Sequence, residues 1–433
     1  MDIISGKNVI KNISWLIFDK VFVLLIGLIV VVRIANYYGP TEYGLYQYAL
    51  SINTLLGVIV LLADGRVIKK RYDAGNEGHI IYNTTVAKVF LSIVSLIIGI
   101  IILVIMGRDS KFNIIYFLLL LNNIVINLGF GFQNYFEYQL KSKNVVIASN
   151  IATIISSILQ LIAISLDYSI VVIVFIIFSS SVLKLGILYT QFKRNYKFRI
   201  KTSIDFDIVG AIIRESIPLA IAAAASTIYH RIDQVMLGSM LGVSEVGIYS
   251  ISNKMISVVA IAIGPLSVSV FPKMIDWYSS NRELYYKRYK AITSLSTWIY
   301  IIGTIFALLV APLVFTRFLS DAYIQSLSLF RIHVLGTFFS YNAVMRTSHF
   351  TLTNNAHILM ISQIISALSN IVLNYILIPY SGVYGAAVAT VITQFMSMFL
   401  LNIFFKNGRE VFWLQLKGLN PIYIIKLIKN YLI

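Results

Sequence analysis

Residues 86–106 read VAKVFLSIVSLIIGIIILVIM, an apolar stretch in which Lys88 is the one charged residue. A bilayer core is about 30 Å thick, and ~20 mostly apolar residues in an α-helix cross it. Similar stretches recur along all 433 residues, which are 58% hydrophobic and 12% charged with a mean hydropathy of +0.83. A soluble domain carries about twice that share of charge. The sequence therefore predicts an all-α, multi-pass integral membrane protein.

The apolar stretches predict twelve transmembrane helices. We place them at residues 14–35, 45–65, 84–106, 114–132, 145–166, 169–191, 212–237, 248–271, 291–315, 328–349, 358–378 and 384–405. Cytoplasmic loops of membrane proteins carry an excess of Lys and Arg. With the N-terminus inside, most loop cations fall on one side, and the other side holds only Arg108, Lys111 and Arg317. Both termini are therefore predicted to be cytoplasmic, and the net charge of +17 reports topology rather than nucleic-acid binding.

Several kinds of chemistry are excluded or disfavoured by the sequence. The chain has 0 cysteines, which rules out disulfides, thiolate metal sites and cysteine nucleophiles. It contains no P-loop, H-E-x-x-H or G-x-S-x-G motif, so we expect no covalent chemistry. The apolar stretch 12–36 is too long for the core of a signal peptide, so no cleavable signal is expected.

One short motif occurs twice, as GPTEYGLY at residues 39–46 and as GVSEVGIY at residues 242–249. Its repeated positions are Gly39, Glu42 and Gly44 in the first copy and Gly242, Glu245 and Gly247 in the second. Each copy falls in a predicted outer hairpin between the first and second span of its half. Glycine preference in short hairpins is the simpler explanation, but the number of matches favours an internal repeat.

Because each half has an even number of spans, the two repeats share one orientation in the membrane. We predict a six-helix lobe at residues 1–191, a basic cytoplasmic linker at 192–211, a second six-helix lobe at 212–405 and a cytoplasmic amphipathic tail at 406–433. The lobes would be related by a parallel pseudo-two-fold axis along the membrane normal. Transporters with such repeats bind their substrate in a central cavity between the repeats.

Charged residues within the spans suggest what such a cavity binds. Basic residues at membrane depth outnumber the acids there, which are Asp19, Asp64, Glu215 and Asp233. A charge at mid-bilayer costs at least about 3 kcal/mol, so it usually faces a polar interior or reaches outward to water. For cations near span ends, including Lys88, we predict that the long side chain extends outward and places its charge in the water.

The remaining polar residues form stripes at helical spacing. The predicted cavity lining consists of Arg231, Gln234, Asn253, Lys254, Arg331, Asn342 and Arg346. An alternative is that these side chains hold helices together through pairs such as Arg231–Asp233. Because the acids cannot neutralise the bases, we expect an anionic substrate, and arginine suits phosphate or pyrophosphate.

Two further stretches add a family resemblance. Residues 374–390 read NYILIPYSGVYGAAVAT, and residues 231–234 read RIDQ. Together with the repeated hairpin and the Phe271-Pro272 pair, they resemble the Wzx-type polysaccharide biosynthesis flippases of the multidrug/oligosaccharidyl-lipid/polysaccharide exporter superfamily.

The resemblance implies a function. Such flippases move polyprenyl-pyrophosphate-linked oligosaccharides from the cytoplasmic to the outer leaflet of the bacterial cytoplasmic membrane, for O-antigen, lipopolysaccharide or capsule synthesis. A polymerase and a chain-length regulator of the same pathway would be partners, with no nucleic acid and no cofactor. Coupling to H⁺ or Na⁺ is left open, with Asp19, Asp64 and Asp233 as the candidate residues.

Three other functions compete with this interpretation. A multidrug/cation antiporter of the same superfamily would be expected to line its cavity with carboxylates. A peptidoglycan-precursor flippase would be expected to have two further spans. A membrane polysaccharide polymerase, a different class of protein, would need a long outer loop for its catalytic residues, and none is predicted.

Overall fold

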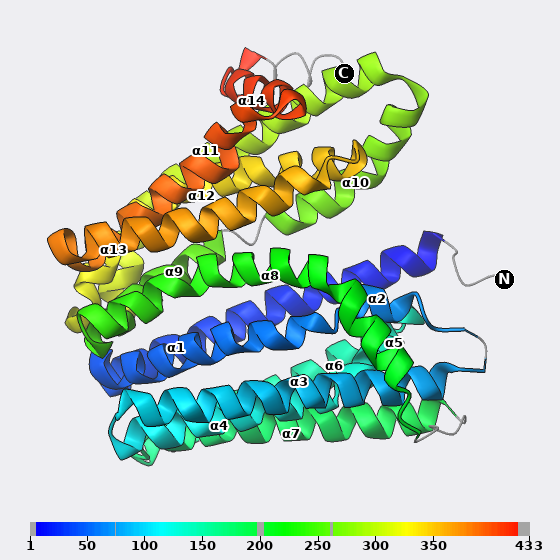
Figure 1. The fold of residues 1–433 in the computed structure, drawn as a ribbon. Helices are drawn as coiled ribbons and strands as arrows, with labels where there is room; N and C mark the ends of the chain where they lie inside the picture. Colours follow the sequence, from blue (N-terminus) through cyan, green and yellow to red (C-terminus); the bar gives the residue numbers. More distant parts are fainter. Residues whose placement is uncertain (1–5, 74, 197–202, 260–262, 423–433) are drawn as a thin grey trace. The chain divides into compact units, whose positions relative to one another are not determined.

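The computed structural model describes the backbone of residues 6–73, 75–196, 203–259 and 263–422, and few side chains before residue 22 or within 260–269. The elements in these ranges are helical, with no strand among them (Figure 1). The chain forms two compact units, Met1–Thr227 and Ile228–Ile433. The predicted lobe boundaries at residues 191 and 212 remain a prediction.

Unit 1 begins with a long kinked helix. Its elements are α1 (Gly6–Leu56), the 3₁₀ segment η1 (Gly57–Leu62), α2 (Gly65–Lys69), α3 (Glu77–Met106), α4 (Ser110–Leu128), α5 (Phe130–Tyr138), α6 (Ser142–Ser165), α7 (Ile170–Asn195) and most of α8 (Phe206–Met240). Gly39 in α1 has φ 69° and ψ 176°, and Pro40 follows it. Glycine adopts this backbone without a Cβ clash, and proline interrupts the helix, so α1 kinks where the outer hairpin was predicted.

Unit 2 contains a second kinked helix. It comprises the end of α8, α9 (Val243–Val259), α10 (Ile263–Ser280), α11 (Arg282–Phe318), η3 (Asp321–Tyr323), α12 (Ile324–Leu352), α13 (Ala356–Gln394), the π-helical η4 (Phe395–Phe399), the 3₁₀ segment η5 (Leu400–Phe404) and α14 (Lys406–Gly418). Gly382 in α13 has φ 56° and ψ −138°, three residues after Pro379. Gly385 then packs so closely that an added Cβ would lie 2.2 Å from the carbonyl oxygen of Leu377.

Among the described residues, 8 helices are long and apolar enough to cross a membrane. Two of them, Phe22–Lys69 and Ala356–Phe404, each contain a pair of predicted spans joined across a glycine kink. The predicted span 328–349, which corresponds to α12, is not among the eight, because Arg331, His333 and Arg346 lower its hydropathy. The chain is thus a multi-pass membrane protein, while the count of twelve and the repeat remain predictions.

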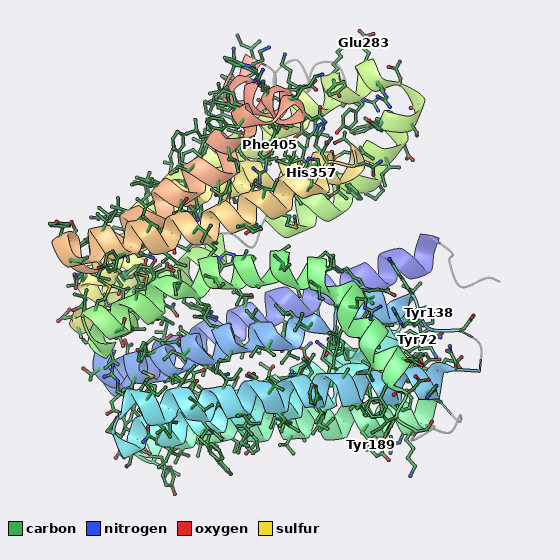
Figure 2. All side chains as sticks on the ribbon, viewed as in Figure 1. Tyr72, Tyr138, Tyr189, Glu283, His357 and Phe405 are labelled. Atoms are coloured by element: carbon green, nitrogen blue, oxygen red, sulfur yellow. The ribbon has the colours of Figure 1, made fainter. Side chains whose placement is uncertain are left out.

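Aromatic side chains fill the end of unit 1 where α2 and α5 meet. Tyr72 and Tyr138 lie together there (Figure 2), with ring centroids 4.8 Å apart, and Tyr72 is also 5.1 Å from Tyr135. Tyr72 and Tyr135 are buried. Tyr72 and Tyr135 therefore belong to the packed core of unit 1, and Tyr138 covers them at the surface.

Candidate functional site

A buried polar network joins four helices of unit 2. The Asp233 carboxylate, on α8, accepts hydrogen bonds at Oδ2 from the Tyr249 hydroxyl of α9 and from Thr390 Oγ1 of α13, the latter at 3.1 Å. On α12, His333 Nε2 lies 3.2 Å from the Tyr249 hydroxyl, and His333 Nδ1 lies 2.9 Å from Ser252 Oγ. Asp233 is 4% exposed, and its second carboxylate oxygen has no hydrogen-bond partner. The network places a carboxylate inside the helical unit with only one oxygen satisfied.

The network unites the sequence stretches that carry the family resemblance. Asp233 belongs to RIDQ, Tyr249 ends the second hairpin motif, and Thr390 ends the stretch 374–390. Asp233 was predicted from the sequence, whereas Tyr249, His333 and Thr390 were not. The two motif ends were a usable signal for Tyr249 and Thr390. His333 is a polar residue within a predicted span, and no motif in the sequence links it to Asp233.

Two cations, Arg231 and Lys254, lie beside the network. Arg231 is half-buried, and its Nη1 donates a hydrogen bond to Gln234 Oε1 at 3.3 Å. Lys254 of α9, also half-buried next to Asn253, is close enough to Arg231 for their charges to repel. Asp233 is directed toward Tyr249 and Thr390, and within the described part of unit 2 it forms no ion pair with Arg231. The alternative of an Arg231–Asp233 pair is thus not what the structure shows.

Arg346 of α12 is buried and bonded to the backbone. Its Nη1 lies 3.0 Å from the Ser397 carbonyl oxygen, 3.2 Å from that of Met398 and 3.0 Å from Asn402 Oδ1. The π-helical and 3₁₀ turns of η4 and η5 interrupt the regular hydrogen-bond ladder there, which frees carbonyl groups. Arg346 therefore stabilises an interrupted helix, as the helix-joining alternative proposes.

The structure does not bring the other two predicted residues of α12 to Arg231. Asn342 Oδ1 accepts a hydrogen bond from Thr297 Oγ1 of α11 at 2.8 Å. Arg331 is exposed. It lies roughly 22 Å along the helix axis from Arg346, at 1.5 Å per residue, so a shared angular face does not place both in one site.

The candidate coupling residues of unit 1 have different surroundings. Asp64 caps α2 by accepting from the Arg66 backbone N–H at 2.7 Å, and it forms an ion pair with the same residue at 2.9 Å. These contacts give Asp64 a structural role. The side chain of Asp19 lies outside the described residues.

Lys88 differs from its prediction. It does not reach outward to water but is 5% exposed, with Nζ 2.9 Å from the Val60 carbonyl oxygen of η1 and 4.1 Å from the centre of the Phe130 ring. The prediction was wrong because it judged depth from the span end alone. The Val60 carbonyl oxygen accepts both the backbone N–H of Ala63 and the Lys88 ammonium group, and so holds this ammonium group inside the unit.

The repeated hairpin glycines share one backbone feature. Gly39 and Gly242 both have positive φ, 69° and 124°, which favours glycine. Glu42 forms an ion pair with Lys111 at 2.7 Å, and Glu245 is half-buried. Gly44 and Gly247 are buried within helices. The first glycine of each motif is therefore a turn position, and the second is a packing position.

The helical fold is that of membrane transporters. It matches the solved inward closed structure of the lipid II flippase MurJ with a TM-score of 0.71 at 15% identity, over 96% of this chain and 92% of that one. It also matches an inward-facing multidrug resistance MATE family transporter of the MOP superfamily with a TM-score of 0.70 at 16% identity, over 94% and 96% of the two chains.

The chain belongs to the polysaccharide biosynthesis protein family, whose pattern matches residues 9–277. It is 20% identical over 408 residues to the capsular polysaccharide biosynthesis protein CapF of Staphylococcus aureus, which covers 92% of this chain and 99% of CapF. The predicted family and all-α transporter fold are confirmed. This family and this fold favour transport over enzymatic catalysis.

Proposed function

We propose that this protein flips a polyprenyl-pyrophosphate-linked oligosaccharide repeat unit from the cytoplasmic to the outer leaflet, for capsule or O-antigen synthesis. Family membership and the similarity to CapF support a role in polysaccharide synthesis. The fold shared with a lipid II flippase supports a lipid-linked cargo. A bacterial cytoplasmic membrane with both chain termini on the cytoplasmic side fits the distribution of loop cations.

The observation that carries the proposal is the pair of cations at Arg231 and Lys254. Asp233 attracts Arg231 but cannot neutralise both cations, so the two cations and this acid together keep a net positive charge. Two repelling cations at membrane depth are costly unless an anion binds them. A pyrophosphate carries two phosphoryl groups, and a guanidinium group can donate two parallel hydrogen bonds to one of them.

We assign the roles around this pair as follows. Arg231 and Lys254 bind the pyrophosphate, with Gln234 orienting the guanidinium group and Asn253 beside Lys254. Arg331 is an outlying cation for the headgroup, and Arg346 and Asn342 support the helices. The lipid tail stays in the bilayer while the two repeats rock around the headgroup, as in alternating access.

Ion coupling is assigned to Asp233. This acid is buried, has one unpartnered oxygen and is linked by hydrogen bonds to three other helices. Binding of H⁺ or Na⁺ there would change the charge next to Arg231 and so link ion binding to cargo binding. A polymerase and a chain-length regulator would receive the flipped unit.

Complementation of a deletion strain tests the proposal. Lipid-linked glycans are quantified by mass spectrometry and surface polysaccharide by staining, in cells that carry wild-type protein, Arg231→Ala, Lys254→Ala or Arg231→Lys. Arg214→Ala is the matched control, because Arg214 is exposed on the same helix, α8. We expect complete lipid-linked units to accumulate with both alanine variants at matched protein level, partial recovery with Arg231→Lys and normal surface polymer with the control.

Other outcomes identify the competing functions. Unpolymerised single units at the cell surface of the deletion strain would indicate a polymerase. Unchanged glycans with new sensitivity to cationic dyes would indicate a cation antiporter. Normal surface polymer with both alanine variants would remove the cationic pair from the mechanism.

A further inference from the structure

The C-terminal helix α14 is held against unit 2 by one face. Gly408, Val411, Gln415 and Gly418 are buried and recur every three or four residues. Gly418 and Leu419 offer their carbonyl oxygens to α11, to Ser294 Oγ at 3.0 Å and to Trp298 Nε1 at 3.2 Å. Gln415 Oε1 accepts from Asn402 Nδ2 at 3.1 Å. These contacts fix the helix on unit 2 and determine which face points outward.

The outer face of α14 combines cations with a large aromatic ring. Lys406, Arg409 and Lys417 are exposed, and Trp413 between them is 57% exposed. Their spacing of three or four residues puts all four on the side opposite the buried face. Glu410 is the one acid of α14. A basic helix face with an exposed tryptophan is typical of helices that lie in the membrane–water interface.

The place where α14 docks agrees with an interfacial position. α11 carries its charges in its first turns, up to Lys290, and has none from Ala291 to Thr316. The end of α14 bonds to Ser294 and Trp298, directly after that change from charged to apolar sequence. The helix therefore lies across α11 at the level where the apolar part of α11 begins. Phe404, where the preceding membrane-spanning segment ends, is 73% exposed.

We propose that this outer face, formed by Lys406, Arg409, Trp413 and Lys417, binds the headgroups of anionic phospholipids. The cations supply the charge complementarity, and the indole ring sits among the glycerol and upper acyl groups of the lipid. A basic surface beside a membrane-spanning segment attracts anionic lipids in preference to zwitterionic ones. The inference concerns lipids of the surrounding membrane and does not depend on the identity of the cargo.

Quenching of Trp413 fluorescence by brominated lipids tests the inference. The full-length protein is placed in phosphatidylcholine nanodiscs that contain a small, equal fraction of brominated phosphatidylglycerol or brominated phosphatidylcholine. The signal of Trp413 is the difference between the wild type and Trp413→Phe. We expect severalfold stronger quenching by the brominated phosphatidylglycerol. The variant Lys406→Gln/Arg409→Gln/Lys417→Gln should be quenched equally by both lipids.

A matched variant separates a local surface from general attraction. Lys70→Gln/Lys193→Gln/Arg194→Gln removes the same charge from exposed positions of unit 1 and should keep the lipid preference of Trp413. Unchanged melting temperatures of both triple variants establish that they fold. Equal quenching in the wild type, or a preference that survives loss of the α14 cations, would overturn the inference. So would a Trp413 that neither lipid quenches, because that face would then make no contact with the membrane.

Discussion

Substitution of Arg346 should affect stability more than cargo recognition. Arg346→Ala removes the donor that serves the Ser397 and Met398 carbonyl oxygens and Asn402 Oδ1. Met398 O keeps a second donor, Asn402 Nδ2 at 3.2 Å, so two buried acceptors are left without a partner. Each such acceptor costs about 1–3 kcal/mol. Removal of a buried charge offsets part of this loss, which leaves a net destabilisation of roughly 2–4 kcal/mol.

The assay is thermal unfolding of the purified protein in detergent. A unit of about 200 residues loses roughly 2–4 °C in melting temperature for each kcal/mol, so we expect a decrease of about 5–15 °C. Arg346→Lys should fall between the wild type and Arg346→Ala, because an ammonium group cannot serve all the acceptors at once. Arg331→Ala, an exposed arginine on the same helix, is the control and should stay within about 0.5 kcal/mol of the wild type.

Two results would refute this reasoning about Arg346. A melting temperature of Arg346→Ala equal to that of the wild type would mean that the interrupted helix does not need the guanidinium group. Loss of glycan export by Arg346→Ala without any loss of stability would indicate that Arg346 binds the cargo. Arg231→Ala is expected to give that second pattern, because Arg231 is half-buried and its guanidinium group donates to the side chain of Gln234 on the same helix.

Three further perturbations have expected outcomes that unfolding or expression measurements can check. Gly385→Ala should lower the melting temperature by several degrees, because the added Cβ would lie 2.2 Å from the backbone of Leu377. Gly303→Ala is the control and should leave the melting temperature unchanged, because its added Cβ would meet nothing within 4 Å. Equal effects of the two substitutions would contradict this prediction. Gly242→Ala should reduce the level of folded protein by straining a backbone with φ 124°, at a cost of about 1–3 kcal/mol, and a normal level would remove that argument. Burial raises the pKa of Glu410 above its ordinary value of 4.5, so the ionised form of Glu410 destabilises the fold. Glu410→Gln should therefore raise the melting temperature at pH 7. This gain should disappear below about pH 4.5, where the carboxyl group is protonated in both the folded and the unfolded state. A gain that persists at low pH would show that burial of the carboxylate is not its cause.

The sequence predicts the fold class because long apolar stretches and the distribution of loop cations depend on the bilayer alone. Contacts between helices that are far apart in the sequence are harder to predict. The charge surplus identified Arg231 and Lys254 as candidates, and the structure shows Lys254 near Arg231 and not near Arg331. Helical periodicity gives the angle of a residue around its axis but not which neighbouring helix faces it at a given depth.

The interrupted helices explain why Lys88 was misjudged and why the contacts of Arg346 were not predicted. Apolar periodicity does not reveal that η1 will form a 3₁₀ turn or η4 a π-helical turn, and these turns carry the carbonyl groups that accept from Lys88 and Arg346. Without knowledge of these turns, a buried cation looks like a residue that reaches to water or binds an anion. Asp233 was recognised as an intramembrane acid, but its partners Tyr249 and Thr390 come from two other helices, and His333 of a third contacts Tyr249, an arrangement that only the tertiary structure brings together.

The two interruptions also impose an order on biogenesis. Val60 leaves the ribosome 28 residues before Lys88, whereas Arg346 leaves it 51 residues before Ser397. The acceptor of the Lys88 ammonium group is thus synthesised before the charge itself, and a charge is costly at membrane depth, so η1 and α3 should enter the bilayer as a pair. In unit 2 the order is reversed, because the charged Arg346 is synthesised before the residues that accept its hydrogen bonds. We therefore expect nascent chains halted between α12 and α13 to remain at the translocon longer than chains halted after η5, a difference that crosslinking of arrested chains would measure.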